Sequence, residues 1–158
     1  MLGANKDEME LFGTPEGELE DEETEIKMVY GKNTDFMYGK FPDGSRSSPH
    51  FHICEQINFV QEGKIWMFVE DEAFLLGPGD FHRIPPKKVH WSRVEEGPVV
   101  ITEAHSPPMI GDDWSTAVGL FGDDEDPTPE ESARNIWASE DYAENEEEMM
   151  QEKLEESA

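Results

Sequence analysis

The sequence has a single cysteine, few basic residues and no long apolar run. Because Cys54 has no second thiol to pair with, an intramolecular disulfide is excluded. No stretch reaches the roughly 18 consecutive apolar residues that a membrane helix needs. The opening residues, Met-Leu-Gly-Ala-Asn-Lys-Asp-Glu, lack the apolar run of a signal peptide. We therefore expect a soluble protein of the reducing cytoplasm, with no membrane partner.

Basic residues are scarce: the 158 residues include 12 lysines and arginines against 38 acidic residues, for a net charge of −26. The acidic excess lies at the two ends. Residues 1–26 have a net charge of −9 and residues 108–158 of −15, whereas residues 27–107 have 11 acidic and 9 basic residues. This distribution predicts a nearly neutral domain between two acidic arms. Because such a field repels nucleic acid, we expect none as a partner.

Short β-prone runs fill the central segment between glycines and prolines. The runs cover residues 26–30, 35–40, 51–60, 65–70, 73–76, 81–84, 89–93 and 99–105. Gly63 and Gly97-Pro98 are among the expected turns between them. Regular short strands with turn signals are typical of a sandwich or a closed barrel. We expect one all-β domain, because 158 residues is the length of a single domain.

The pattern changes after Ser106-Pro-Pro. Thr128-Pro129-Glu130-Glu131 combines an N-cap, a first-turn proline and a capping-box glutamate, which predicts a helix start, and a second helix is expected near Ser139. Like charges favour partial disorder over residues 143–158. The apolar residues of this stretch predict an amphipathic arm that covers the barrel or a partner subunit. They are Ile136, Trp137, Tyr142, Met149, Met150 and Leu154.

Three histidines and a glutamine are spaced as a metal site needs them. His50, His52 and Gln56 share one face of a regular strand, because successive side chains alternate. Glu55 would point away from that face, although a carboxylate is a common ligand. His90 follows two prolines and would bring a third imidazole from across a barrel. A lone histidine is more often a structural residue, but this joint pattern favours a metal site.

The two clusters resemble the two motifs of the cupin superfamily, the small double-stranded β-helical (jelly-roll) barrels. The family's first motif has Gly, five residues, HxH, three or four residues, Glu, six residues and Gly. This chain has Gly44, His50, His52, Gln56 and Gly63 at those places. The second motif has Gly, five residues, Pro, one residue, Gly, two residues and His, matched here by Gly79, Pro85, Lys87 and His90. Gln56 and Lys87 depart from the family's Glu and Gly.

The resemblance implies a cupin barrel over residues 27–107, with residues 1–26 and 108–158 as arms. It implies a homodimer and one divalent transition metal, which is iron, zinc, nickel or manganese. The implied ligands are His50, His52, Gln56 and His90, with Glu55 the alternative to Gln56. The closest resemblance is to small one-domain members, which include polyketide cyclases and enzymes that open unsaturated uronates.

Side chains that share a face with the expected ligands are candidates for the chemistry. Glu103 and His105 lie on one face of the last expected strand, where they act as general acid or base or form a surface pair. Cys54 has the parity of the ligands, but a small buried cysteine is the alternative. The expected substrate pocket comprises Phe36, Tyr38, Cys54, Asn58, Phe68 and Ser92.

Three functions fit this site. The first is Lewis-acid isomerase, lyase or cyclase chemistry on a small carbonyl compound or hydroxy acid, because neutral ligands leave the metal its full +2 charge. The second is an Fe(II) dioxygenase, which the neutral Gln56 disfavours because it raises the potential of the iron. The third is a barrel that binds a metal and a small ligand as a sensor, without turnover.

Overall fold

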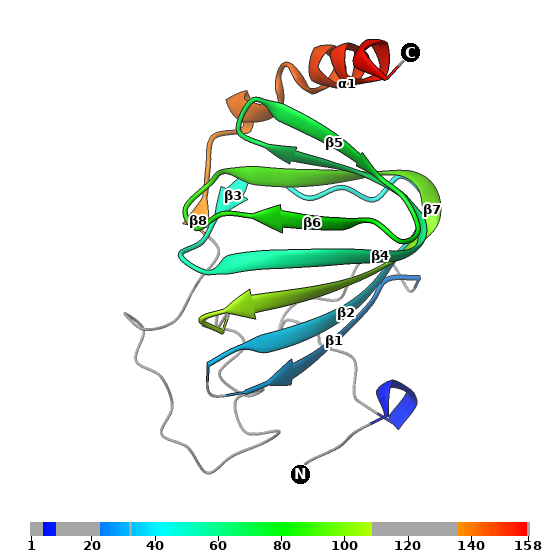
Figure 1. Ribbon diagram of the computed structural model, residues 1–158, viewed down its shortest axis with the longest axis vertical. Coiled ribbons are helices and arrows are strands. Elements are labelled where there is room, and N and C mark those ends of the chain that lie inside the picture. The colour runs from blue at the N-terminus through cyan, green and yellow to red at the C-terminus, as the bar shows by residue number, and fades with distance from the viewer. Residues whose placement is uncertain (1–4, 9–22, 32, 109–135, 158) are drawn as a thin grey trace.

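The computed structural model describes residues 5–8, 23–31, 33–108 and 136–157. Strands dominate this part of the chain, and one α-helix lies near the C-terminal end (Figure 1). The elements are η1 (Lys6–Glu8), β1 (Glu25–Tyr30), β2 (Asp35–Phe41), β3 (His50–Phe51), β4 (Glu55–Val69), β5 (Glu72–Leu76), β6 (Phe81–Ile84), β7 (His90–Ser106), β8 (Ile136–Trp137), η3 (Glu140–Ala143) and α1 (Glu146–Glu156).

Two long antiparallel strands, β4 and β7, pair with each other along most of their length and take part in both halves of the barrel. The first half of β4 pairs with β6, and the second half of β7 pairs with β2 and through it with β1. The other half of β4 pairs with β5, and the beginning of β7 pairs with β3, which in turn pairs with β8. The expected all-β jelly-roll barrel is confirmed.

The core fills the space between the two halves, because alternate residues of each strand point inward. A first cluster of buried aliphatic and methionine side chains lies inside the barrel: Val60, Ile65, Met67, Leu76, Ile84, Val94, Val99 and Ile101. A second, richer in aromatic rings, contains Trp66, Phe68, Ala73, Val89, Trp91 and Met150. No helix of the described residues is long and apolar enough to span a membrane.

The predicted turns at Gly63 and at Gly97-Pro98 are wrong, because both lie inside strands. Two pairs of predicted strands are therefore single strands, β4 and β7. The register between them shifts on either side of Gly63, which bends β4 from one half of the barrel into the other. Gly63 has φ +78°, and a Cβ there would lie 2.4 Å from the carbonyl oxygen of Pro98. The glycine thus permits a bulge with close backbone contact.

The C-terminal segment is more ordered than its charge suggests. The expectation of partial disorder is wrong for residues 146–156, which form α1. The helix is held because Met150 is buried in the aromatic cluster. The helix expected near Ser139 is a 3₁₀ turn, η3, whose N-cap Ser139 side chain accepts a hydrogen bond from the Asp141 amide. The predicted start at Thr128 lies outside the described residues.

Replacing Gly63 by alanine tests this bulge. Gly44→Ala is a matched control, because Gly44 also has a positive φ, +77°, but nothing lies within 4 Å of its added Cβ. We expect Gly44→Ala to lower the free energy of unfolding by about 1 kcal/mol, the conformational cost alone. Gly63→Ala should lower it by about 2 to 5 kcal/mol, since overpacking adds to that cost. Equal losses in urea denaturation would contradict the close contact.

Candidate metal centre

Three imidazoles converge at one end of the barrel. One potential ligand nitrogen from each of His50, His52 and His90 lies within 4.8 Å of the others. His50 is on β3 and His90 begins β7, and these two are directly opposed across the strand pair. His52 lies in the irregular turn between β3 and β4, and not on the regular strand that the alternation predicts. The cluster is thus assembled from two segments that lie far apart in the sequence, residues 50–52 and the start of β7.

The backbone fixes the direction of all three rings. Each imidazole places Nδ1 within hydrogen-bond distance of a main-chain carbonyl two residues away. The carbonyls belong to Ser48, Cys54 and Lys88, at 2.8, 3.0 and 2.8 Å from Nδ1 of His50, His52 and His90. A carbonyl only accepts, so Nδ1 carries the proton and Nε2 presents its lone pair. This is the arrangement that metal-binding histidines need.

Burial keeps these rings neutral. Desolvation lowers the pKa of His50, that of His52 to about 4 and that of His90 to about 3. Near pH 7 the three lone pairs are therefore available. Nε2 of His90 is buried and has no hydrogen-bond partner among the described residues. Such a group is costly unless something binds it, and a divalent metal would satisfy it.

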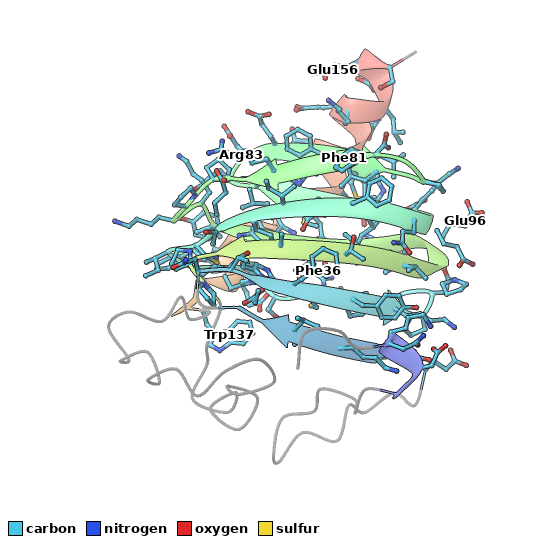
Figure 2. All side chains as sticks on the ribbon, turned by 60° about the horizontal axis from the view of Figure 1, so that its bottom comes forward. Phe36, Phe81, Arg83, Glu96, Trp137 and Glu156 are labelled. Atoms are coloured by element: carbon cyan, nitrogen blue, oxygen red, sulfur yellow. The ribbon has the colours of Figure 1, made fainter. Side chains whose placement is uncertain are left out.

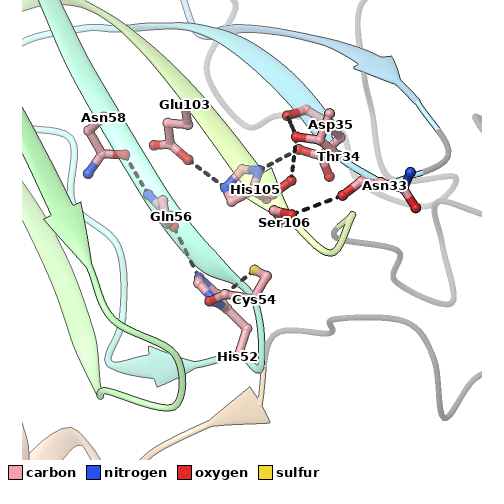
Figure 3. A network of polar contacts seen from close by, with 10 residues as sticks. All are labelled: Asn33, Thr34, Asp35, His52, Cys54, Gln56, Asn58, Glu103, His105 and Ser106. Atoms are coloured by element: carbon pink, nitrogen blue, oxygen red, sulfur yellow. Dashed lines mark hydrogen bonds and ion pairs between the residues drawn. The ribbon is translucent and has the colours of Figure 1, made fainter.

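Gln56 lies beside this cluster with its amide held in one orientation. Its Nε2 donates to Oδ1 of Asn58 at 2.8 Å, which turns Oε1 toward Nε2 of His52, 3.0 Å away (Figure 3). An amide oxygen and an imidazole lone pair then face the same place, as two ligands of one metal would. Glu55 points elsewhere and accepts a hydrogen bond from Nε of Arg83 at 2.6 Å. The geometry favours Gln56 over Glu55 as a fourth ligand.

A buried charged group lies next to the histidine cluster. Nδ1 of His105 is 2.5 Å from Oδ1 of Asp35, and its Nε2 is 3.2 Å from Oε2 of Glu103 (Figure 3). Burial alone lowers the pKa of His105, but hydrogen bonds and charge interactions with the two carboxylates outweigh it and raise this pKa to about 9. His105 is therefore a cation at neutral pH, flanked by two acids.

A cavity of about 240 Å³ opens onto these groups. Its polar lining at the histidine end consists of His50, His90, Gln56, Glu103 and His105. Polar residues also line it at Ser45, Arg46, Ser47 and Ser92. The remaining lining is apolar: Ile26, Met37, Phe41, Ile65, Met67, Trp91, Val94 and Ile101. A volume below that of drug-sized ligand pockets suits a small molecule.

Comparison with known proteins agrees with the fold. Residues 37–105 match the cupin domain family. This part of the chain is a cupin domain. KdgF from Halomonas sp. is 26% identical with a TM-score of 0.53, over 59% of this chain and 84% of that one. An RmlC-like cupin from Shewanella frigidimarina is 18% identical with a TM-score of 0.60, over 72% of this chain and 96% of that one.

A third solved structure, an oxalate decarboxylase variant from B. subtilis, is 14% identical with a TM-score of 0.52. The match covers 58% of this cupin and 27% of that chain. At such identity the similarity concerns the fold alone. A search of curated proteins found no match.

Lys87 is one of the two residues at which this cupin departs from the family motif. The residue has φ +65°, so it keeps the left-handed backbone that a glycine would adopt more easily. Its amide donates to the carbonyl oxygen of His52 at 2.8 Å. The turn before β7 is thus tied to the turn that presents His52.

The aromatic residues expected around the pocket lie elsewhere. Phe36 is 49% exposed on the outer face of β2, because Met37 is the residue that points inward there (Figure 2). Tyr38 shares the outward parity of Phe36. Phe68 is fully buried and stacks on Trp91, with ring centroids 5.0 Å apart. None of Phe36, Tyr38 and Phe68 lines the cavity.

Ser92 lines the cavity, as expected, but Cys54 and Asn58 do not. Cys54 is fully buried, and its Sγ is 3.0 Å from Nδ1 of His52. Burial raises the pKa of this thiol to about 12, so it stays protonated and is a packing residue rather than a ligand. Asn58 orients Gln56.

Two important residues were not singled out from the sequence. Asp35 begins β2, and the only signal for it is that it shares parity with Met37. Arg46 lies in the loop between Gly44 and His50, where a basic residue alone does not indicate a pocket. Among the described residues that line the cavity, Arg46 is the one Lys or Arg side chain.

The raised pKa of His105 predicts a specific pH dependence. Its folded-state pKa lies above the ordinary 6.5, so the stability it contributes is fully present below pH 6.5 and is lost as the pH rises through about 9. In the metal-free protein, the His105 ring signals in NMR spectra should titrate near pH 9. Asp35→Asn should lower this midpoint more than Glu103→Gln, because the Asp35 contact is shorter. Titration below pH 6.5 would contradict the paired arrangement.

Proposed function

We propose that this cupin is a metal-dependent enzyme that acts on a small organic acid with a carbonyl or hydroxyl group, by isomerase, lyase or cyclase chemistry. The observation behind the proposal is that His50, His90 and Gln56 line the same cavity as Glu103, and that His52 completes the cluster of neutral imidazoles beside them. Such a ligand set leaves a divalent metal its full charge, and the bound metal supplies Lewis acidity toward a carbonyl or hydroxyl oxygen.

Glu103 is suited to move a proton in this cavity. Its carboxylate lines the cavity wall and accepts a hydrogen bond from the His105 ring, whose other nitrogen is held by Asp35. The contact with the His105 ring fixes the direction of the Glu103 carboxylate, so that one carboxylate oxygen can take a proton from the substrate. His105 and Asp35 act through Glu103 and are positioning residues in this proposal.

Arg46 supports an acid as the substrate. Arg46 lines the cavity, and its guanidinium donates from Nη2 to Oε2 of Glu146 at 3.2 Å. A guanidinium has five N–H donors, so one such contact leaves capacity for a substrate carboxylate. Ser47 and Ser92, whose hydroxyls are 3.1 Å apart on the same wall, offer neutral partners for hydroxyl groups.

Metal content and oxygen consumption separate this function from the two others. Untagged protein would be assayed against hydroxy acids, keto acids and diols, with product formation and dissolved oxygen followed together. Zinc, nickel or manganese with turnover and no oxygen uptake supports the proposal. Stoichiometric iron with substrate-dependent oxygen uptake would indicate a dioxygenase, and metal and ligand binding without product would indicate a sensor barrel.

The ligand set is tested by metal stoichiometry. His52→Ala and His90→Ala should abolish stoichiometric metal, measured by inductively coupled plasma mass spectrometry on untagged protein. Gln56→Ala should weaken the metal affinity by at least about tenfold, whereas Glu55→Ala should leave it unchanged, because Glu55 faces Arg83. The opposite ranking of these two variants in a chelator competition would mean that Glu55 is the ligand.

The role of Glu103 is tested by Glu103→Gln. If Glu103 transfers the proton, kcat on any acid that is turned over should fall by roughly 100-fold or more. Metal affinity should stay at the wild-type level, because Glu103 is not in the ligand set. The control Glu55→Gln makes the same chemical change on the outer face. Wild-type kcat in Glu103→Gln would remove Glu103 from the mechanism.

A further inference from the structure

The strand that contains His50 is held from two sides, and one side is the C-terminal arm. Strand β3 has only two residues, and its pairing with β7 is the single pair between His50 and His90. Its other edge pairs with β8, where His50 lies opposite Trp137 and Phe51 opposite Ile136 (Figure 1). So short a strand has little stability of its own, and β8 closes its edge.

Two further contacts of the arm reach the immediate surroundings of His50. The amide of Ala138 donates to the carbonyl oxygen of Pro49 at 3.0 Å, one residue before His50. The Trp137 ring packs edge-on against the His50 ring, with centroids 5.8 Å apart. The indole is 69% exposed, so its contact with His50 is not part of a large core. The arm therefore touches both the backbone and the ring of this ligand.

Glu146 anchors the arm to the barrel. Its side chain is 9% exposed, and Oε2 accepts hydrogen bonds from Nε1 of Trp91 at 3.1 Å and from Nη2 of Arg46 at 3.2 Å. Arg93 completes the environment, with Nη1 at 3.6 Å from Oε1. A buried carboxylate is tolerated only with such partners, so these two hydrogen bonds and the ion pair with Arg93 fix the start of α1.

We propose that the arm over residues 136–150 positions His50 and thereby sets the metal affinity, although no arm residue is a ligand. This inference rests on the proposed metal site. The arm lies outside the part of the chain that matches the cupin domain family, residues 37–105. Strand β8 and Trp137 hold His50 in place, and Glu146 holds the arm. Trp137 and Glu146 are positioning residues.

Paired variants test the inference on the full-length protein with Zn²⁺ as the probe. Ala138→Pro removes the amide that binds Pro49, whereas Ala138→Gly keeps it. Glu146→Gln removes the buried charge, whereas Glu148→Gln makes the same change at an exposed position of α1. We expect Ala138→Pro and Glu146→Gln to weaken Zn²⁺ binding by about tenfold in a chelator competition, and the two controls to bind like wild type.

Trp137→Ala tests the same inference with less risk of unfolding than Ala138→Pro or Glu146→Gln, because the ring that it removes is mostly exposed. We expect a several-fold loss of Zn²⁺ affinity, restored in part by Trp137→Phe, which keeps an aromatic edge. The Co²⁺ absorption spectrum should also change in Trp137→Ala, since it reports ligand geometry. Two results together would overturn the proposal. Trp137→Ala would keep the wild-type Zn²⁺ affinity and Co²⁺ spectrum, and whichever of Ala138→Pro and Glu146→Gln folds would bind Zn²⁺ with wild-type affinity.

Amide hydrogen exchange in the metal-free protein separates this inference from the proposed function. The amides of His50 and Phe51 should lose protection in Ala138→Pro and Glu146→Gln but not in their controls. If wild-type protein bound no metal, the proposed function would fail, while this measurement would still decide whether the arm holds β3. Unchanged protection in both variants would refute the positioning role.

Discussion

The metal centre depends on hydrogen bonds between imidazole Nδ1 atoms and main-chain carbonyls. Each of the three histidines uses a carbonyl two residues away, so the local path of the backbone decides where the ring points. The ring itself has no other way to expose Nε2 consistently, because a neutral imidazole can place its single proton on either nitrogen. The bulged strands, the Lys87 turn and the β3–β8 pairing all act on that backbone path. Site geometry in this protein is thus a property of the main chain.

The four proposed ligands carry no formal charge, and the charged side chains lie in the layer of residues around them. The facing groups are three neutral rings and an amide, while Asp35, His105 and Glu103 lie on one side. On another side, Glu146 is enclosed by Arg46 and Arg93. Charges at this distance can orient and polarise without neutralising a bound cation. The acidic excess of the whole chain therefore says little about the electrostatics at the site, which are set by these few pairs.

The sequence is sufficient to predict the fold class and the clustering of the three histidines. It is insufficient to predict the residues that hold those histidines in place. Strand alternation and glycine punctuation locate the barrel, but a glycine inside a bulge and a glycine in a turn look alike, so the pattern at Gly63 wrongly predicts a turn. Phe36 and Met37 are both apolar, and only the register with β7 decides which one points inward. Asp35 and Glu146 become significant through partners about 70 and 55 residues away, His105 and Trp91. No local pattern encodes such pairs.

Lys87 occupies a motif position where the family has glycine, and its backbone has a conformation that glycine adopts easily. The backbone at this position is left-handed although a side chain is present, and its amide still reaches the carbonyl of His52. The conformational penalty of a lysine there is about 1 kcal/mol, small enough for the rest of a barrel to absorb. Searches that demand the glycine letter would pass over chains of this kind, whereas a search on dihedral angles would find them. This turn keeps a left-handed backbone angle without glycine, the residue that adopts such an angle with the least strain.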